Sequence, residues 1–120
     1  MYKLADIVVN ASQKPEGFGR TASEAMAMGK PLVTFNQGGI SEQIVFYDNN
    51  FKISFNDIEK MSKVIDQILI MPKESLKKFG VLSRKFVLEN FTKKKMILGT
   101  INFYKNLLNK NNIEEKNINY

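Results

Sequence analysis

Two glutamates, Glu16 and Glu24, are the side chains of this 120-residue protein best suited to chemistry, with seven residues between them. Glu16 opens the run EGFG, in which Gly17 and Gly19 flank Phe18. Because glycine has no Cβ and adopts positive φ readily, the backbone of this loop can come close to a ligand and expose its N–H groups. A helix is expected directly after the loop, and the first amides of a helix favour an anion such as phosphate.

The two carboxylates suit a different part of the same ligand. A carboxylate can accept hydrogen bonds from two neighbouring hydroxyl groups, as on a sugar ring. An anion site beside a hydroxyl site therefore predicts binding of a sugar nucleotide. Each feature also has a simpler interpretation, since a Gly-x-Gly pair alone is more often a turn and Glu24 alone would be an exposed helix acid.

Three motifs follow one another in this region: EGFG at Glu16–Gly19, EAMAMGKP at Glu24–Pro31 and GGISE at Gly38–Glu42. Their order and spacing resemble the E-x7-E region of the group 1 glycosyltransferases, which have the GT-B fold. The resemblance covers residues 2–108, the second half of that family's C-terminal domain. It implies an α/β fold, namely half of a Rossmann-like, doubly wound parallel sheet of about three strands followed by C-terminal helices. Residues 1–108 would form a partial donor-binding domain, and residues 109–120 a polar, frayed tail.

The resemblance also implies a role for each residue of the motifs. Glu16 would be the catalytic residue and hold hydroxyls of the transferred sugar, whereas Glu24 would accept hydrogen bonds from the ribose 2′ and 3′ hydroxyls. The other expected substrate-binding residues are Gly17, Phe18 and Gly19 at the sugar, Arg20 and Thr21 at the diphosphate, and Gly38 and Gly39 at the nucleotide. The implied reaction is hexosyl transfer with retention of configuration from a UDP-, GDP- or ADP-sugar, with no cofactor and no metal.

The parts of the family's architecture that this sequence does not contain allow other functions. In the family, a further β-α-β block with basic residues against the diphosphate comes first, preceded by an acceptor-binding domain, and this sequence contains neither. The chain would then be an inert nucleotide-sugar-binding or interaction module left by a shortened gene, or one subunit of a split transferase. We expect little turnover by the chain alone.

Composition excludes several other classes of site. The chain has no histidine and no cysteine, which removes the commonest base, disulfides and cysteine metal sites. The net charge of +6 comes almost entirely from lysine, while nucleic-acid binding favours arginine with exposed aromatics. The cluster Lys93–Lys95 is expected to be a solvated helix face, with contact to nucleic acid or peripheral contact to an anionic membrane as the alternatives. With no signal segment, a cytoplasmic location is expected, extending to the inner face of the membrane.

Hydrophobic periodicity predicts the elements that position the motifs. The expected elements are strands at Asp6–Ala11, Pro31–Phe35 and Phe51–Phe55, and helices at Arg20–Met28, Ser41–Val45, from Asn56 to Met71, at Ser75–Glu89 and from Thr92 to Leu108. Ser41, Asn56 and Thr92 are the expected helix caps, and Gly29 is the expected stop of the first helix. The apolar stripes of the last three helices are expected in the core.

The first predicted strand presents a separate problem. Its contiguous apolar residues are typical of a parallel strand covered on both faces. One of its edges has no partner in this sequence, and soluble proteins rarely leave such an edge bare. We therefore expect Asp6–Ala11 to pair with a second copy of the chain or with a missing half.

Overall fold

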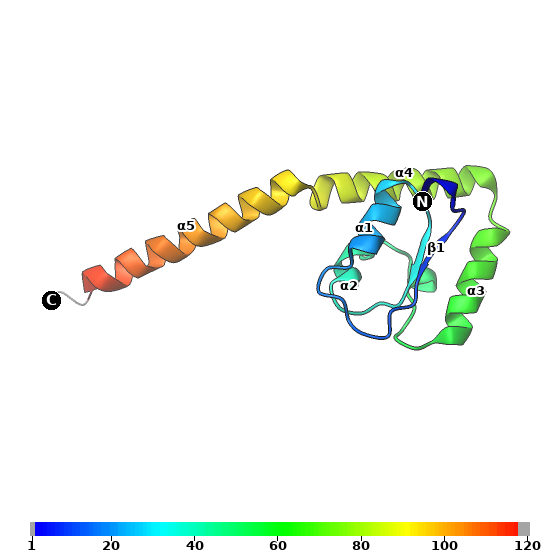
Figure 1. The fold of residues 1–120 in the computed structure, drawn as a ribbon, viewed down its shortest axis with the longest axis horizontal. Coiled ribbons are helices and arrows are strands. Elements are labelled where there is room, and N and C mark those ends of the chain that lie inside the picture. Colours follow the sequence, from blue (N-terminus) through cyan, green and yellow to red (C-terminus); the bar gives the residue numbers. More distant parts are fainter. Residues whose placement is uncertain (1, 118–120) are drawn as a thin grey trace. The chain divides into compact units, whose positions relative to one another are not determined.

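The computed structural model describes residues 2–117, and side chains from 2 to 109 (Figure 1). Contacts divide the chain into two compact units, one up to residue 89 and one from residue 90. No helix within the described residues has the length and apolarity needed to cross a bilayer.

The sheet contains two of the three predicted strands. Strand β1 (Val8–Asn10) and strand β2 (Leu32–Thr34) lie parallel, with Val9 opposite Val33, and helix α1 (Arg20–Ala27) connects them. This is the predicted β-α-β unit, in which each strand is shorter at both ends than predicted. The α/β fold class is therefore confirmed.

The predicted third strand at Phe51–Phe55 is wrong over most of its length. The chain there begins as a 3-10 helix, η2 (Asn49–Phe51), because the Asp48 side chain accepts a hydrogen bond from the backbone N–H of Asn50 at 2.9 Å. Only Ile53 pairs with the sheet, through one parallel bridge to Phe35. The Asp48 cap thus favours a 3-10 turn over an extended conformation at the start of this segment. Of the predicted strand, only the bridge of Ile53 remains.

The helices follow the predicted order with different ends. The remaining elements are η1 (Tyr2–Leu4), α2 (Ile40–Gln43), α3 (Ile58–Leu69), α4 (Lys73–Asn90) and α5 (Lys93–Asn117). Helix α3 is capped by Asp57, whose carboxylate accepts from the Lys60 N–H at 2.9 Å, so the prediction of Asn56 as the cap is wrong. Asn56 has a positive φ of 64° and belongs to the preceding turn. The cap of α2 is Gly39 rather than Ser41, whereas Thr92 does accept from the Lys95 N–H at 3.2 Å.

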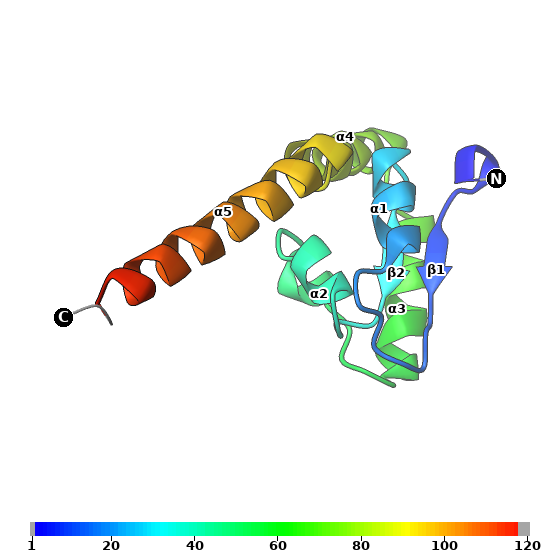
Figure 2. The same cartoon turned by 60° about the vertical axis from the view of Figure 1, so that its left-hand side comes forward.

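Helices cover both faces of the sheet (Figures 1 and 2). On the α3 face, the buried cluster consists of Val33, Phe35, Ile53, Met61, Val64 and Ile68. On the α1 face, Ala22, Ala25 and Met26 are fully buried. The small side chains of Ala22 and Ala25 let the helix backbone approach the strands closely, and Met26 fills the remaining space. Val9 is 46% exposed, so the expectation that the first strand is covered on both faces is wrong at this position.

Helix α4 packs against the end of α1. Gly29 stops α1 with a φ of 67°, as predicted, and its N–H donates to the Met26 carbonyl at 2.9 Å. A Cβ on Gly80 of α4 would lie 2.3 Å from the Gly29 carbonyl oxygen, so the two backbones are in direct contact there. The Arg84 guanidinium donates to the Ala27 carbonyl and satisfies one of the last acceptors of α1.

Helix α5 differs from its prediction in burial and in length. The predicted core stripe of this helix is 43–65% exposed, so that prediction is wrong; its residues are Met96, Ile97, Ile101, Tyr104, Leu107 and Leu108. Leu98 and Phe103 are exposed as well. The helix continues past Leu108 to Asn117, a stretch without glycine or proline to stop it. Residues 118–120 lie outside the described residues, and the division of the domain at residue 108 stays a prediction.

Replacing Gly80 with alanine should destabilise the first unit by about 1–3 kcal/mol, because the new methyl group must displace the Gly29 backbone. Chemical denaturation followed by circular dichroism measures this free energy. Gly99→Ala is the matched control, since nothing lies within 4 Å of a Cβ there and alanine favours the helix. Equal stability of Gly80→Ala and wild type would contradict the close α1–α4 packing.

Candidate functional site

The two glycine loops meet at one edge of the sheet. They follow β1 and β2, whose carboxyl ends lie together because the strands are parallel. The N–H of Gly39 donates to the carbonyl of Glu16 at 2.9 Å, which joins the loops directly. The prediction that both loops face the same edge is confirmed.

Three of the glycines are required by contacts within the protein. A Cβ on Gly39 would lie 2.1 Å from the Gly17 carbonyl oxygen, and one on Gly38, at φ 55°, would lie 2.6 Å from the Glu16 carbonyl oxygen. Gly19 has a φ of 79°, and its Cβ would lie 2.4 Å from Cγ1 of Ile40. At Gly17, by contrast, nothing lies within 4 Å of a Cβ. These three glycines therefore let the loops approach each other, and Gly17 is the one with open space beside it.

Glu16 is half-buried and held by the end of β1. The Asn10 side-chain amide donates to Glu16 Oε1 at 3.0 Å, and the Asn10 amide oxygen accepts from the Ser12 N–H at 3.0 Å. Both polar groups of Asn10 are thus occupied, which limits its rotation and orients the carboxylate. Glu16 Oε2 lies on the side of Gly19, 3.6 Å from where a Cβ on that glycine would stand.

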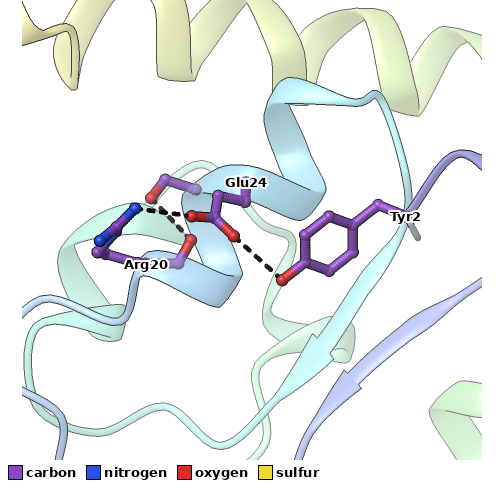
Figure 3. A network of polar contacts seen from close by, with 4 residues as sticks. Tyr2, Arg20 and Glu24 are labelled. Atoms are coloured by element: carbon purple, nitrogen blue, oxygen red, sulfur yellow. Dashed lines mark hydrogen bonds and ion pairs between the residues drawn. The ribbon is translucent and has the colours of Figure 1, made fainter.

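Glu24 lies on α1 between Arg20 and Tyr2 (Figure 3). The Tyr2 hydroxyl donates to Glu24 Oε2 at 3.2 Å, and Arg20 Nη2 lies 3.3 Å from Glu24 Oε1. The side chains of Arg20 and Glu24 are 86% and 46% exposed, so this i,i+4 ion pair contributes less than about 1 kcal/mol. A ligand can therefore compete with either partner for the carboxylate.

The structure brings the predicted site residues together in two groups. The first contains Glu16 and the glycines of both loops, and the second contains Arg20 and Glu24. The two glutamates bind different partners among the described side chains, Asn10 for one and Tyr2 with Arg20 for the other. Their convergence on one ligand stays a prediction.

The group of Glu16 and the loop glycines is bordered by Phe18, Thr21 and the start of α1. Phe18 is 43% exposed and Thr21 is half-buried. Helix α1 begins after Gly19 without a side-chain cap, so its first amides are the donors that such a helix offers to an anion. Phosphate binding there also stays a prediction.

Three residues of the site were missed in the sequence: Tyr2, Asn10 and Gln43. Asn10 carried a usable signal, because it is a polar residue at the carboxyl end of a predicted buried strand. Tyr2 and Gln43 carried none, since only the tertiary fold places them against α1 and the first glycine loop.

Gly39→Ala should destabilise the protein by about 1–3 kcal/mol, because its methyl group would overlap the Gly17 carbonyl. Gly17→Ala places a methyl group in open space and should change the unfolding free energy by less than about 0.5 kcal/mol. Urea denaturation of the two variants, run side by side, measures the difference. Similar effects of the two substitutions would contradict the observed contact between the loops.

Known proteins share both the sequence and the fold described above. The family model for glycosyl transferases group 1 matches residues 1–86. The spore coat protein SA of Bacillus subtilis (strain 168) is 33% identical over 93 residues, which are 76% of this chain and 24% of that protein. The putative glycosyltransferase YtcC of the same organism is 34% identical over 93 residues, 77% of this chain and 23% of that protein.

A solved structure supports the same assignment. The glycosyltransferase from Rickettsia africae ESF-5 superposes with a TM-score of 0.77 at 33% identity, over 89% of this chain and 28% of that one. The chain thus spans about a quarter of the length of the proteins it resembles. Since the family model covers most of the chain and a solved structure shares its fold, this protein belongs to the group 1 glycosyltransferases.

Proposed function

We propose that this chain supplies the donor-binding part of a retaining glycosyltransferase that uses a nucleoside diphosphate sugar. The observation that carries the proposal is the direct contact of the Glu16 loop with the second glycine loop, at the carboxyl edge of the sheet. Open α/β sheets bind ligands at that edge. Membership of the family supports the same ligand class.

The proposal gives each part of the site one task. Glu16 accepts hydrogen bonds from the transferred sugar and acts at the reacting centre, with Gly17, Phe18 and Gly19 around it. Gly38 and Gly39 border the nucleotide. The donor is a UDP-, GDP- or ADP-sugar, and no further cofactor takes part.

The leaving diphosphate would lie at the start of α1. The N–H groups of Arg20 and Thr21 have no acceptor within the helix, and the helix dipole adds positive potential there. Fixed donors aimed at developing negative charge are usually the largest single contribution to catalysis. The Arg20 guanidinium is 86% exposed and pairs only weakly with Glu24, so it could leave that ion pair to face such a charge.

A non-catalytic module or a subunit of a split transferase is the second candidate. The favouring observation is that Arg20, the basic side chain at the start of α1, already pairs with Glu24. A diphosphate leaving group then needs further cations from another chain segment or a partner. Such a protein would bind the nucleotide sugar without transferring the hexose.

Glu24→Ala should weaken binding of a nucleotide sugar about 10- to 100-fold, because each charge-assisted hydrogen bond contributes about 1.5–3 kcal/mol. Isothermal titration calorimetry with UDP-, GDP- and ADP-sugars measures the change. Tyr2→Phe removes the hydrogen bond of the phenol to Glu24 but leaves the carboxylate, so it should bind the donor like wild type. Unchanged affinity of Glu24→Ala would contradict the ribose role.

The outer edge of β1 is the proposed place for a protein partner. The Val8 N–H donates to the Pro31 carbonyl at 2.9 Å. Adjacent residues of a strand direct their backbone groups to opposite edges, so those of Val9 face the side away from β2. Within the described residues β1 pairs with β2 alone. The proposed partner is a second copy of the chain or a missing half of the same sheet.

The purified 120-residue chain should therefore be a dimer in size-exclusion chromatography with light scattering. Val9→Pro removes the outward N–H and should shift the mass to that of a monomer, while Val9→Thr keeps it and should stay dimeric. A wild-type monomer at high concentration would refute self-pairing.

A cytoplasmic location and a peripheral membrane contact complete the proposal. The described side chains of α5 combine exposed apolar residues with lysines at 93, 94, 95 and 105 and include no acid. Exposed apolar groups next to lysines suit an anionic membrane surface. Lys93–Lys95 would be the point of this contact.

A further inference from the structure

Gln43 is a fully buried polar side chain that touches the first glycine loop. Its side-chain Nε2 donates to the carbonyl of Phe18 and, at 3.3 Å, to that of Gly19. Gln43 is 0% exposed and lies at the end of α2, one turn after Gly39. Helix α2 thus holds the Glu16 loop at three points: through Gly39, through the Ile40 side chain and through Gln43.

The orientation of the Gln43 amide follows from its partners. Two carbonyl oxygens face it, so the NH₂ group must point to them, since the reverse orientation would set oxygen against oxygen. Its own Oε1 is then buried, with no hydrogen-bond partner among the described residues. A buried oxygen without a partner is unfavourable for stability, and an apolar side chain of the same length would avoid that cost. The NH₂ group of Gln43 favours stability through its bonds to the two carbonyls, and the unpaired Oε1 opposes it, so the net contribution of Gln43 to stability is small.

The two bonds determine where the neighbouring N–H groups point. The described peptide bonds are all trans, so the C=O and N–H of each peptide unit point in opposite directions. The carbonyls of Phe18 and Gly19 point toward Gln43. The N–H groups of Gly19 and Arg20, which share those peptide units, consequently point away from α2.

We infer that Gln43 is a positioning residue, which aims the N–H groups of Gly19 and Arg20 at the diphosphate of the donor. This inference rests on the proposed function, because it concerns the ligand of the same site. The Gly19 carbonyl also accepts from the Ala22 N–H at 3.0 Å, so Gln43 acts chiefly on the Phe18–Gly19 peptide unit, which lies next to Gly17 and is otherwise easier to rotate. Gln43 acts before any ligand arrives and so lowers the ordering cost of binding.

The test compares Gln43→Met, which keeps the length of the side chain but has no donor, with Gln67→Met at an exposed position of α3. Titration of the ¹⁵N-labelled 120-residue chain with UDP-, GDP- and ADP-sugars measures affinity and the shifts of the Gly19 and Arg20 amides. Gln43→Met should bind about 10-fold more weakly, with altered shifts and faster hydrogen exchange at these two amides. Gln43→Met loses the donor to the two carbonyls but also removes the unpaired Oε1, so its unfolding midpoint should stay close to that of wild type. Gln67→Met should match wild type throughout.

A second variant separates positioning from packing. Gln43→Glu places a carboxylate oxygen against the two carbonyls and should weaken binding more than Gln43→Met does. Gln43→Met with wild-type affinity and wild-type amide shifts would overturn the inference, as would a loss of affinity that only parallels a loss of stability. If wild type binds none of the sugar nucleotides, the proposed function fails, whereas hydrogen exchange of the free protein still tests whether Gln43 orders the two amides.

Discussion

The hydrogen bond from the Gly39 N–H to the Glu16 carbonyl is the interaction on which the site depends. It joins two loops that are more than 20 residues apart in the sequence and follow adjacent parallel strands. The bond is possible only because Gly38 and Gly39 lack a Cβ, whose place is occupied by the backbone of the first loop. Helix α2 begins directly after Gly39. The Ile40 side chain therefore packs against Gly19, and the Gln43 amide donates to the carbonyl of Gly19.

The glutamates occupy environments of different rigidity. Glu16 is half-buried, and Asn10, whose own amide oxygen is occupied, fixes one of its oxygens. Glu24 is exposed and held by an ion pair that water screens. A rigid carboxylate suits contact with a reacting sugar, where small displacements reduce the rate strongly. In the proposed function, the exposed carboxylate of Glu24 would exchange Arg20 and Tyr2 for the hydroxyls of a ribose.

Local sequence signals predicted elements well where no competing local interaction existed. Gly29 ends α1 because its positive φ costs a glycine little, and Thr92 caps α5 with its hydroxyl. The prediction failed at Phe51–Phe55, where the alternation of apolar residues suggested a strand. The side chain of Asp48 instead caps a 3-10 turn there. It failed again for α5, because periodicity marks an apolar helix face without showing whether anything covers it.

Motif spacing and parallel strand pairing leave few arrangements, so the amino-acid sequence was enough to predict the family, the order of the first strands and helices, and the adjacency of the two glycine loops. Which glycines make contacts within the protein, and which one faces open space, depends on the folded arrangement of the loops. The fold also brings Tyr2, Asn10 and Gln43 into hydrogen-bond contact with the motif residues. These contacts were not predictable, because hydrogen bonds between parts of the chain that are distant in sequence depend on how the elements pack, and no local pattern records that packing.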